Sequence, residues 1–287
     1  AIPCLVLSFI SIMLALRFSK KETHQPTKKL PVKNLIGINL QYNNIDYKPE
    51  LLLSERFADL VSKARNGKQP LRILHIGDSH IQADVFTGET RRLLSRWLKD
   101  SPTARGFSFP YQIAGSNNPD DYNVAWKGEW TRNRAANGAK SKLGVAGISI
   151  FTCDRESEFS IALNKNYAGG ENFNLLTIYY DANNPDIILR PKGESQLLHR
   201  TTSYVTYEFA KSTDSVSVEV CWGRSMNDSI ILYGFELQNT RSKFLYHAAG
   251  VNGASVSTFL QSENFALQAS FLKPQVVVCL LYTSDAA

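Results

Sequence analysis

The chain has 287 residues, of which 43% are hydrophobic and 11% aromatic, and its formal net charge is +6. This composition excludes a disordered protein and suffices for one or two globular domains. The charge is modest and partly gathered between positions 17 and 33, and no basic patch with interleaved aromatic residues suggests nucleic-acid binding.

Residues 1–18 are almost wholly apolar up to Arg17. Such a segment predicts either the core of a signal peptide or a membrane anchor, so a membrane is the expected partner of this end. The basic residues that follow suit the flank of a membrane segment. Residues 19–39 are largely polar and contain Pro, which predicts a linker.

The next predicted elements are a helix, a strand and a helix. Apolar residues recur at helical spacing over 49–66 and again over 83–99. Between them, Leu71–Ile76 is a run of mostly branched apolar residues, as in a buried parallel strand. This order is typical of a doubly wound α/β fold.

After Pro102 the pattern changes to short strands separated by turn pairs such as Asn-Gly, Gly-Gly and Asn-Pro. Apolar and polar positions alternate, as in Val216–Val220, which predicts antiparallel pairing. Such runs lie between about 107 and 237, and examples are 147–152, 159–163, 175–180, 187–189, 203–209, 215–220 and 229–237. The α/β pattern returns with a strand at 243–247, a helix at 255–272 and a strand at 273–281.

We therefore predict an α/β fold, namely an incomplete doubly wound parallel sheet with an inserted antiparallel β-sandwich domain. The predicted boundaries are 40–106 for the first part of the α/β domain, 107–240 for the insert and 241–287 for the second, truncated part. The four cysteines lack metal-ligand spacing, and Cys153 and Cys221 are either a disulfide or two separate thiols.

The sequence Gly77-Asp78-Ser79-His80 follows the predicted strand at Leu71–Ile76 directly. Ligands bind outside the carboxyl ends of the strands in open α/β sheets, so Ser79 has the position of a nucleophile. Backbone N–H groups at the start of the next helix would face a developing negative charge. The alternative is that Ser79 only caps that helix.

These four residues resemble the first signature block of the SGNH (GDSL-type) serine hydrolases, and His247–Ser255 resembles the second block. The resemblance implies that Ser79 is the nucleophile and that the N–H group of Gly253 belongs to the oxyanion hole. Gly250 is the less suitable glycine for that role. The resemblance also implies an SGNH-type form of the α/β fold.

The resemblance further implies a third block, with an Asn in the oxyanion hole, and a last block, Asp-x-x-His, with the general base. Neither block is found, and Ser284 falls about where the Asn is expected. The residues from Cys279 onwards resemble translated adapter sequence, and the chain has no initial Met. We therefore expect a fragment that ends natively near Val278 and is inactive by itself.

Four further residues lie in or near the two blocks. Asn252 is expected to contact the cleft, although a role in the turn suits its position equally well. His247 is the one candidate for a surrogate base, because it ends the strand before the second block. His80 is assigned a structural or substrate-contact role, and His75 is assigned to the core.

A β-sandwich inserted at this point resembles the arrangement in bacterial SGNH esterases that remove O-acetyl groups from peptidoglycan, and Arg105–Tyr111 is similar to that group. This resemblance implies an esterase acting on an acetylated cell-envelope polysaccharide, in the periplasm or otherwise outside the cytoplasm, anchored or secreted. The alternatives are an acyltransferase or esterase for another glycan, and a non-catalytic glycan-binding protein on a degenerate scaffold. No cofactor or metal motif is present, so neither group is expected.

Overall fold

The computed structural model of the protein describes residues 5–6, 53–98, 101–102, 104–135, 141–164, 167 and 172–281. Apart from residues 5–6, the predicted membrane segment and linker lie outside the described residues, as does Ser284. No helix of the described part combines the length and the apolar character that a membrane crossing requires.

Four strands form a parallel sheet in the order β1–β15–β2–β14. Their bounds are Leu5–Val6 for β1, Leu71–Gly77 for β2, Phe244–Gly250 for β14 and Val276–Leu280 for β15. The register pairs Gly77 with both Gly250 and Leu280, so the carboxyl ends of three strands meet at one edge. Ligands bind outside this edge in parallel sheets.

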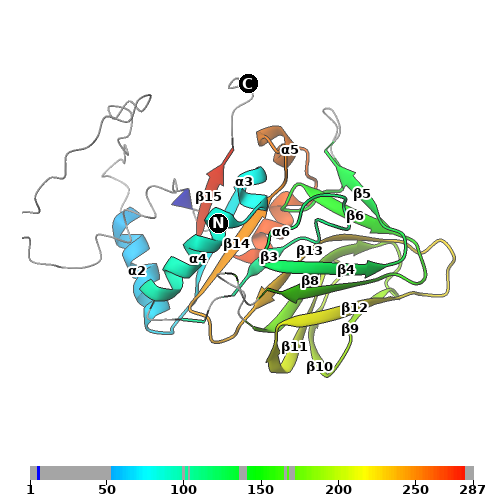
Figure 1. The fold of residues 1–287 in the computed structure, drawn as a ribbon, viewed down its shortest axis with the longest axis horizontal. Coiled ribbons are helices and arrows are strands. Elements are labelled where there is room, and N and C mark those ends of the chain that lie inside the picture. Colours follow the sequence, from blue (N-terminus) through cyan, green and yellow to red (C-terminus); the bar gives the residue numbers. More distant parts are fainter. Residues whose placement is uncertain are drawn as a thin grey trace, which may run out of the picture.

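Helices α2 (Leu53–Arg65) and α4 (Val85–Trp97) cover one face of the parallel sheet (Figure 1). In α2, the residues Phe57, Val61 and Ala64 recur at helical spacing and are buried. Alternate residues of β2 and β14 point into the same apolar cluster, as the side-chain period of two requires. The helix, strand and helix predicted from residue 49 onwards are confirmed in type and order.

The remaining strands form two antiparallel sheets. One has seven strands, in the order β10–β11–β8–β13–β6–β5 with β3 also paired to β13, and the other has the order β4–β7–β12–β9. Buried side chains of both sheets belong to one apolar cluster, so the sheets pack face to face. The bounds are Gly106–Ser108 (β3), Tyr122–Lys127 (β4), Thr131–Arg134 (β5), Ile148–Thr152 (β6), Glu158–Leu163 (β7), Phe173–Ala182 (β8), Ile188–Pro191 (β9), Ser195–Arg200 (β10), Tyr204–Thr213 (β11), Ser215–Cys221 (β12) and Ile230–Gln238 (β13).

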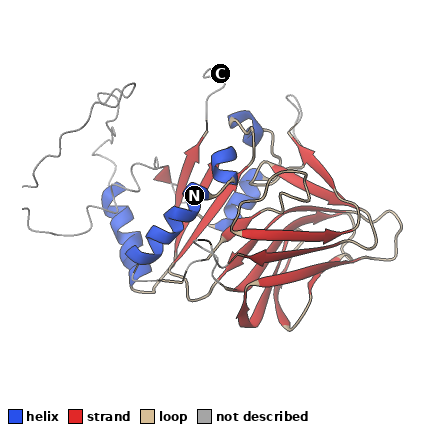
Figure 2. Cartoon of the chain, in the orientation of Figure 1, coloured by secondary structure: helices blue, strands red, loops and turns tan. Residues whose placement is uncertain are grey.

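The predicted α/β fold class is wrong for the described chain. Strand residues outnumber helical residues, 43% against 19%, and most strands lie in the two antiparallel sheets. The helices gather around the four parallel strands (Figure 2). The error has a physical cause: local patterns reveal individual strands, but they do not reveal which set of strands makes up the larger part of the fold. The antiparallel strands are therefore the larger part of the fold, and not an addition to an SGNH-type doubly wound sheet.

The second face of the parallel sheet packs against the antiparallel strands. Leu74 and Ile76 of β2, together with Ala249 of β14, belong to the same buried cluster as residues of both antiparallel sheets. One apolar core therefore extends across the predicted domain boundaries at 106/107 and 240/241. The boundaries themselves stay predictions.

Two short helices, α5 (Val256–Leu260) and α6 (Phe265–Leu272), replace the single helix predicted over 255–272. The interruption lies at Ser262, whose hydroxyl donates to the carbonyl oxygens of Leu143 and Gly144 at 2.7 and 2.9 Å. The loop that precedes β6 thus holds the chain between the helices, a contact that helical periodicity does not reveal.

A buried cluster of charges ties the start of α4 to the first antiparallel strand. Asp84, at the N-cap of α4, and Asp121 form ion pairs with Arg91 and Arg105, and all four side chains are buried. Arg91 lies within α4, whereas Arg105 directly precedes β3. Losing one member would leave a buried charge uncompensated, so the cluster fixes the start of α4 beside the antiparallel sheets.

The cysteines of the described residues are free thiols. Cys153 follows β6 and is exposed, whereas Cys221 ends β12 in the other antiparallel sheet and is half-buried. Of the two alternatives for this pair, the structure therefore contains separate thiols.

Candidate active site

Ser79 lies at the corner between β2 and the short helix α3 (Ser79–Gln82). Asp78 occupies the N-cap position, and its carboxylate accepts the backbone N–H of His80 at 3.0 Å. The Ser79 side chain is exposed, and its hydroxyl has no hydrogen-bond partner among the described residues. Because Asp78 caps the helix, the Ser79 hydroxyl is left open to a substrate.

A second turn follows β14 and touches the Ser79 corner. A Cβ atom on Gly250 would lie 2.7 Å from the carbonyl oxygen of Asp78 and 2.8 Å from the Cβ atom of Ile81. These distances are too short for any side chain, so glycine at this position lets the two turns pack together. Close packing therefore explains Gly250, and Gly253 is left as the candidate donor.

Gly253 adopts φ +74°, a left-handed conformation that suits glycine. Its neighbours in the turn use their N–H groups: Val251 donates to the carbonyl of Gly77 at 3.3 Å, and Ala254 to that of Val251 at 3.0 Å. By contrast, the N–H groups of Gly253 and Ser79 have no hydrogen-bond partner among the described residues. An exposed hydroxyl and free N–H groups on two turns at one edge of a sheet are the parts from which an oxyanion hole is built.

Gln82, which the sequence analysis missed, joins the two turns to a third segment. Its Oε1 atom accepts the backbone N–H of Asn252 at 2.7 Å. Its Nε2 atom donates to the hydroxyl of Ser116 at 2.9 Å and to the carbonyl of Asn117 at 2.7 Å. Its partners are far away along the chain, so no local pattern could have identified this glutamine.

Asn252 lies in the second turn, and its exposed side chain donates to the hydroxyl of Ser116 at 3.4 Å. The hydroxyl of Tyr111 donates to the carbonyl of Gly250. Residues 111–117 therefore form a wall beside the two turns. The position of Asn252 suits the predicted cleft contact as well as the turn role, and the contact stays a prediction.

His247 is not brought to the exposed serine. Its side chain is fully buried, and its Nδ1 atom accepts the N–H of Phe107 at 3.1 Å and lies 3.8 Å from Oε1 of Glu236. Burial, with the positive charges of Arg72 and Arg105, holds the pKa of His247 well below 6.5. A buried neutral imidazole with one ring nitrogen already engaged cannot take a proton from an exposed hydroxyl, so the geometry does not suit a surrogate base.

Glu236 organises the polar groups around His247 at the junction of the sheets. The hydroxyl of Tyr179 donates to Oε2 of Glu236 at 2.8 Å, and the guanidinium of Arg72 donates to Oε1 at 3.4 Å. Burial raises the pKa of Glu236, and these partners oppose that rise. This cluster is structural, because its acidic and aromatic members are closed to solvent.

The two remaining histidines near β2 have different environments. His75 is fully buried, and its Nδ1 atom lies 2.8 Å from the hydroxyl of Tyr246. Burial lowers the pKa of His75 to about 4, against a smaller opposing effect of Asp84. The prediction that His75 is a core residue is confirmed. His80 is exposed, and its Nδ1 atom lies 3.1 Å from a carboxylate oxygen of Asp78, so its ring is held at the corner.

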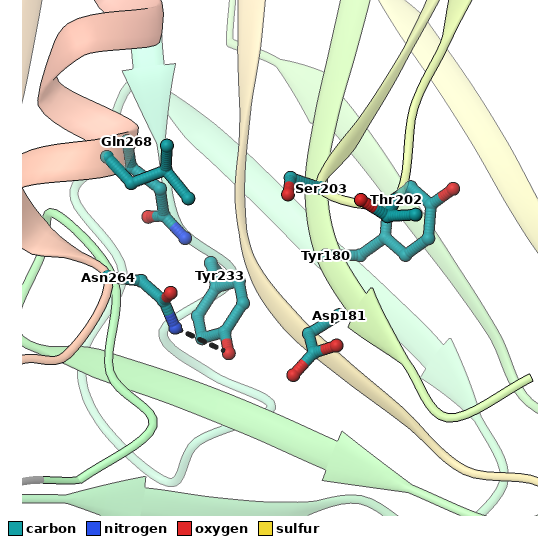
Figure 3. Close-up of a pocket in the computed structure, with 8 residues that line it drawn as sticks. Tyr180, Asp181, Thr202, Ser203, Tyr233, Asn264 and Gln268 are labelled. Atoms are coloured by element: carbon teal, nitrogen blue, oxygen red, sulfur yellow. Dashed lines mark hydrogen bonds between the residues drawn. The ribbon is translucent and has the colours of Figure 1, made fainter.

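A pocket of about 190 Å³ lies elsewhere, lined by residues of α6, β8 and β13 and by the turn before β11. In Figure 3, Gln268 and Asn264 lie on one side, and Asp181 and Ser203 lie across from them. Asn264 donates to the hydroxyl of Tyr233 at 2.9 Å. Neither Ser79 nor Gly253 lines this pocket, so it is separate from the candidate active site.

The Ser79 edge can therefore offer a nucleophile and two donors for a developing oxyanion. One such donor is typically worth about 3 kcal/mol in a transition state. In the part of the chain that the structure describes, no group of three or more His, Cys, Asp or Glu side chains is placed to hold a metal ion. The chemistry that these groups favour is attack of the serine hydroxyl on a carbonyl carbon.

No protein-family model and no curated protein matches the sequence. Among solved structures, the chain is similar to one described as "Peptidoglycan O-acetylesterase in action, 5 min", with a TM-score of 0.58 and 16% sequence identity. The similarity covers 78% of this chain and 59% of that chain, so this chain spans less than two thirds of the length of the solved protein. At this identity the similarity shows that the two chains share a fold, and no more than that.

Proposed function

We propose that the protein is a serine esterase that removes O-acetyl groups from peptidoglycan or a related cell-envelope polysaccharide. The observation that carries the proposal is that the exposed Ser79 hydroxyl and the N–H groups of Ser79 and Gly253, unpaired among the described residues, lie on two turns that pack together at one edge of the parallel sheet. The fold shared with a protein named as a peptidoglycan O-acetylesterase supports the choice of substrate. The proposal places the protein in the cell envelope, where such a substrate occurs.

In the proposed reaction, Oγ of Ser79 attacks the acetyl carbonyl carbon and its proton passes to a general base. The carbonyl oxygen becomes an oxyanion that the N–H groups of Ser79 and Gly253 stabilise. The sugar oxygen leaves with a proton, and water then hydrolyses the acetyl-serine ester. In an SGNH-type enzyme the base is the histidine of the last block, and the sequence contains no such block.

The test is acetate release from O-acetylated peptidoglycan by the full-length protein and by its Ser79→Ala variant. We expect the variant to be slower by at least about 10³-fold, because it lacks the nucleophile. Ser62→Ala is the control, since Ser62 is exposed on α2 and remote from the edge. Both variants should unfold at the temperature of the unaltered protein.

Three other results would redirect the proposal. Equal rates for Ser79→Ala and the unaltered protein would remove Ser79 from the reaction. Binding of peptidoglycan without any acetate release would favour the glycan-binding alternative. Acetyl transfer to an added acceptor sugar in place of water would favour the acyltransferase alternative.

A further inference from the structure

We propose that Gln82 is a positioning residue of this site, which fixes the turn carrying the Gly253 N–H group relative to the Ser79 hydroxyl. The inference rests on the proposed function and adds a residue to it. Gln82 belongs to the same four-residue helix as Ser79, so the nucleophile and the holder of the second turn share one helical turn.

Gln82 makes three of the four hydrogen bonds that its side chain can form. The side chain is 2% exposed, its carbonyl accepts the N–H of Asn252, and its amide nitrogen donates to both Ser116 and Asn117. An amide group offers two N–H donors and a carbonyl oxygen that accepts up to two bonds, and here both donors and the oxygen have partners. A buried side chain with these bonds is fixed in place, and removing it leaves buried polar groups without partners.

The bond to Asn252 matters because of the residue that follows. Gly253 has φ +74°, and apart from its chain neighbours no atom lies within 4 Å of a Cβ position, so no packing at Gly253 adds to the bond from the Ala254 N–H group to the Val251 carbonyl. Glycine moves between backbone conformations with little steric penalty. The N–H bond of Asn252 to Gln82 therefore ties the residue directly before Gly253 to the helix that carries Ser79.

The consequence for catalysis is specific. An oxyanion donor contributes in the transition state and not in the bound substrate, provided that it is already in place. Loss of Gln82 should therefore lower kcat and leave KM nearly unchanged. A general loss of packing would instead lower the melting temperature without this separation.

The test compares Gln82→Leu with Gln268→Leu in the full-length protein. Gln268 is a matched control, since it is 3% exposed and its Oε1 atom accepts the backbone N–H of Val145 at 2.9 Å. We expect Gln82→Leu to lower kcat for acetate release by about 10- to 100-fold, less than complete loss of a donor would. Gln268→Leu should leave kcat within about twofold, because it contacts neither turn.

A second readout does not depend on activity. We expect hydrogen exchange at the Asn252 amide, followed by NMR, to become at least about tenfold faster in Gln82→Leu and to stay unchanged in Gln268→Leu. Unchanged exchange in Gln82→Leu would overturn the positioning role, whatever the kinetics. If the unaltered protein releases no acetate, the proposed function fails, while this exchange experiment still decides whether Gln82 holds the turn.

Gln82→Glu adds a test of the hydrogen bonds themselves. A protonated Glu keeps the acceptor for Asn252 and one donor, whereas the ionised form places a negative charge beside the carbonyl of Asn117. We expect the ratio of the kcat of Gln82→Glu to that of Gln82→Leu to rise as the pH is lowered. A constant ratio across the pH range would contradict a role through hydrogen bonding.

Discussion

Two polar clusters that border the parallel sheet differ in which polar groups they leave open to a ligand. At the junction of the sheets, Glu236, His247 and Tyr179 are buried; the Glu236 carboxylate, the Tyr179 hydroxyl and Nδ1 of His247 are hydrogen-bonded, while Nε2 of His247 is closed to solvent without a partner among the described residues. At the carboxyl edge, the Ser79 hydroxyl is exposed, and the N–H groups of Ser79 and Gly253 have no partner among the described residues. A histidine and a carboxylate that lie close together are therefore not sufficient for a catalytic site. Such a site needs polar groups that are fixed in place and accessible to a substrate.

The difference follows from strand geometry. Successive residues of β14 point to opposite faces of the sheet, so His247 points to the antiparallel strands, whereas Tyr246 points to the helices. The strand ends at Gly250, and beyond it the backbone is free to turn. The polar side chains within the strand are therefore enclosed by packing, whereas polar groups in the turns stay accessible to a ligand.

The largest stability effect should come from the buried cluster. Replacing Glu236 by Leu leaves the Arg72 guanidinium and the Tyr179 hydroxyl without their carboxylate, at a cost of about 3 kcal/mol in the free energy of unfolding. Glu219→Leu is the matched control, because its pair with Arg190 is exposed and worth at most about 1 kcal/mol. Urea denaturation of both variants measures the contrast, and equal losses would contradict the distinction between the two clusters.

A smaller effect should separate the two glycines of the carboxyl edge. Gly250→Ala forces a Cβ atom against the Asp78 carbonyl and should cost about 2 kcal/mol through overpacking. Gly253→Ala meets no atom within 4 Å and should cost about 1 kcal/mol, because Ala tolerates φ +74° poorly. Urea denaturation ranks the two variants. A larger loss for Gly253→Ala would reverse the assignment of packing to one glycine and conformation to the other.

The smallest effect concerns His75, which is buried and neutral between the sheet and the helices. Because its folded pKa of about 4 lies below the value of 6.5, the unfolded chain binds a proton that the folded chain does not. Stability is therefore present above pH 6.5 and is lost as the pH falls towards 4, by about 1 kcal/mol at pH 5.5. In His75→Gln, the fall in unfolding free energy between pH 7 and 5.5 should be smaller by that amount. An identical fall in both proteins would contradict a neutral His75.

The sequence predicts individual helices and strands well, but it predicts the contacts between distant parts of the chain poorly. Every strand predicted between 147 and 237 has a counterpart among β6–β9 and β11–β13, because apolar alternation shows in the residues themselves. The strands β5 and β10, with the sequences TRNR and SQLLHR, escaped prediction because they lie at the edges of the larger sheet and are largely exposed. The α/β class was wrong because local patterns do not reveal which set of strands dominates.

The residues of the candidate site likewise fall into those that the sequence predicts and those that it does not. Ser79 and the second turn were predictable from motifs that follow a strand, and the structure places both at one edge. Gln82 was not predictable, since its partners at 116, 117 and 252 meet it only in the folded chain. His247 looked suitable from its position near the second block, and only the side-chain direction within β14 shows that it is enclosed.

The most direct measurement is to trap the covalent intermediate. The full-length protein is mixed with an O-acetylated substrate, quenched in acid during turnover and digested, and its peptides are analysed by mass spectrometry. The account predicts one acetyl group, located on Ser79, which disappears as substrate is exhausted and is absent in Ser79→Ala. Turnover with the acetyl group on another residue, or with no acetylated peptide under conditions that slow deacylation, would contradict it.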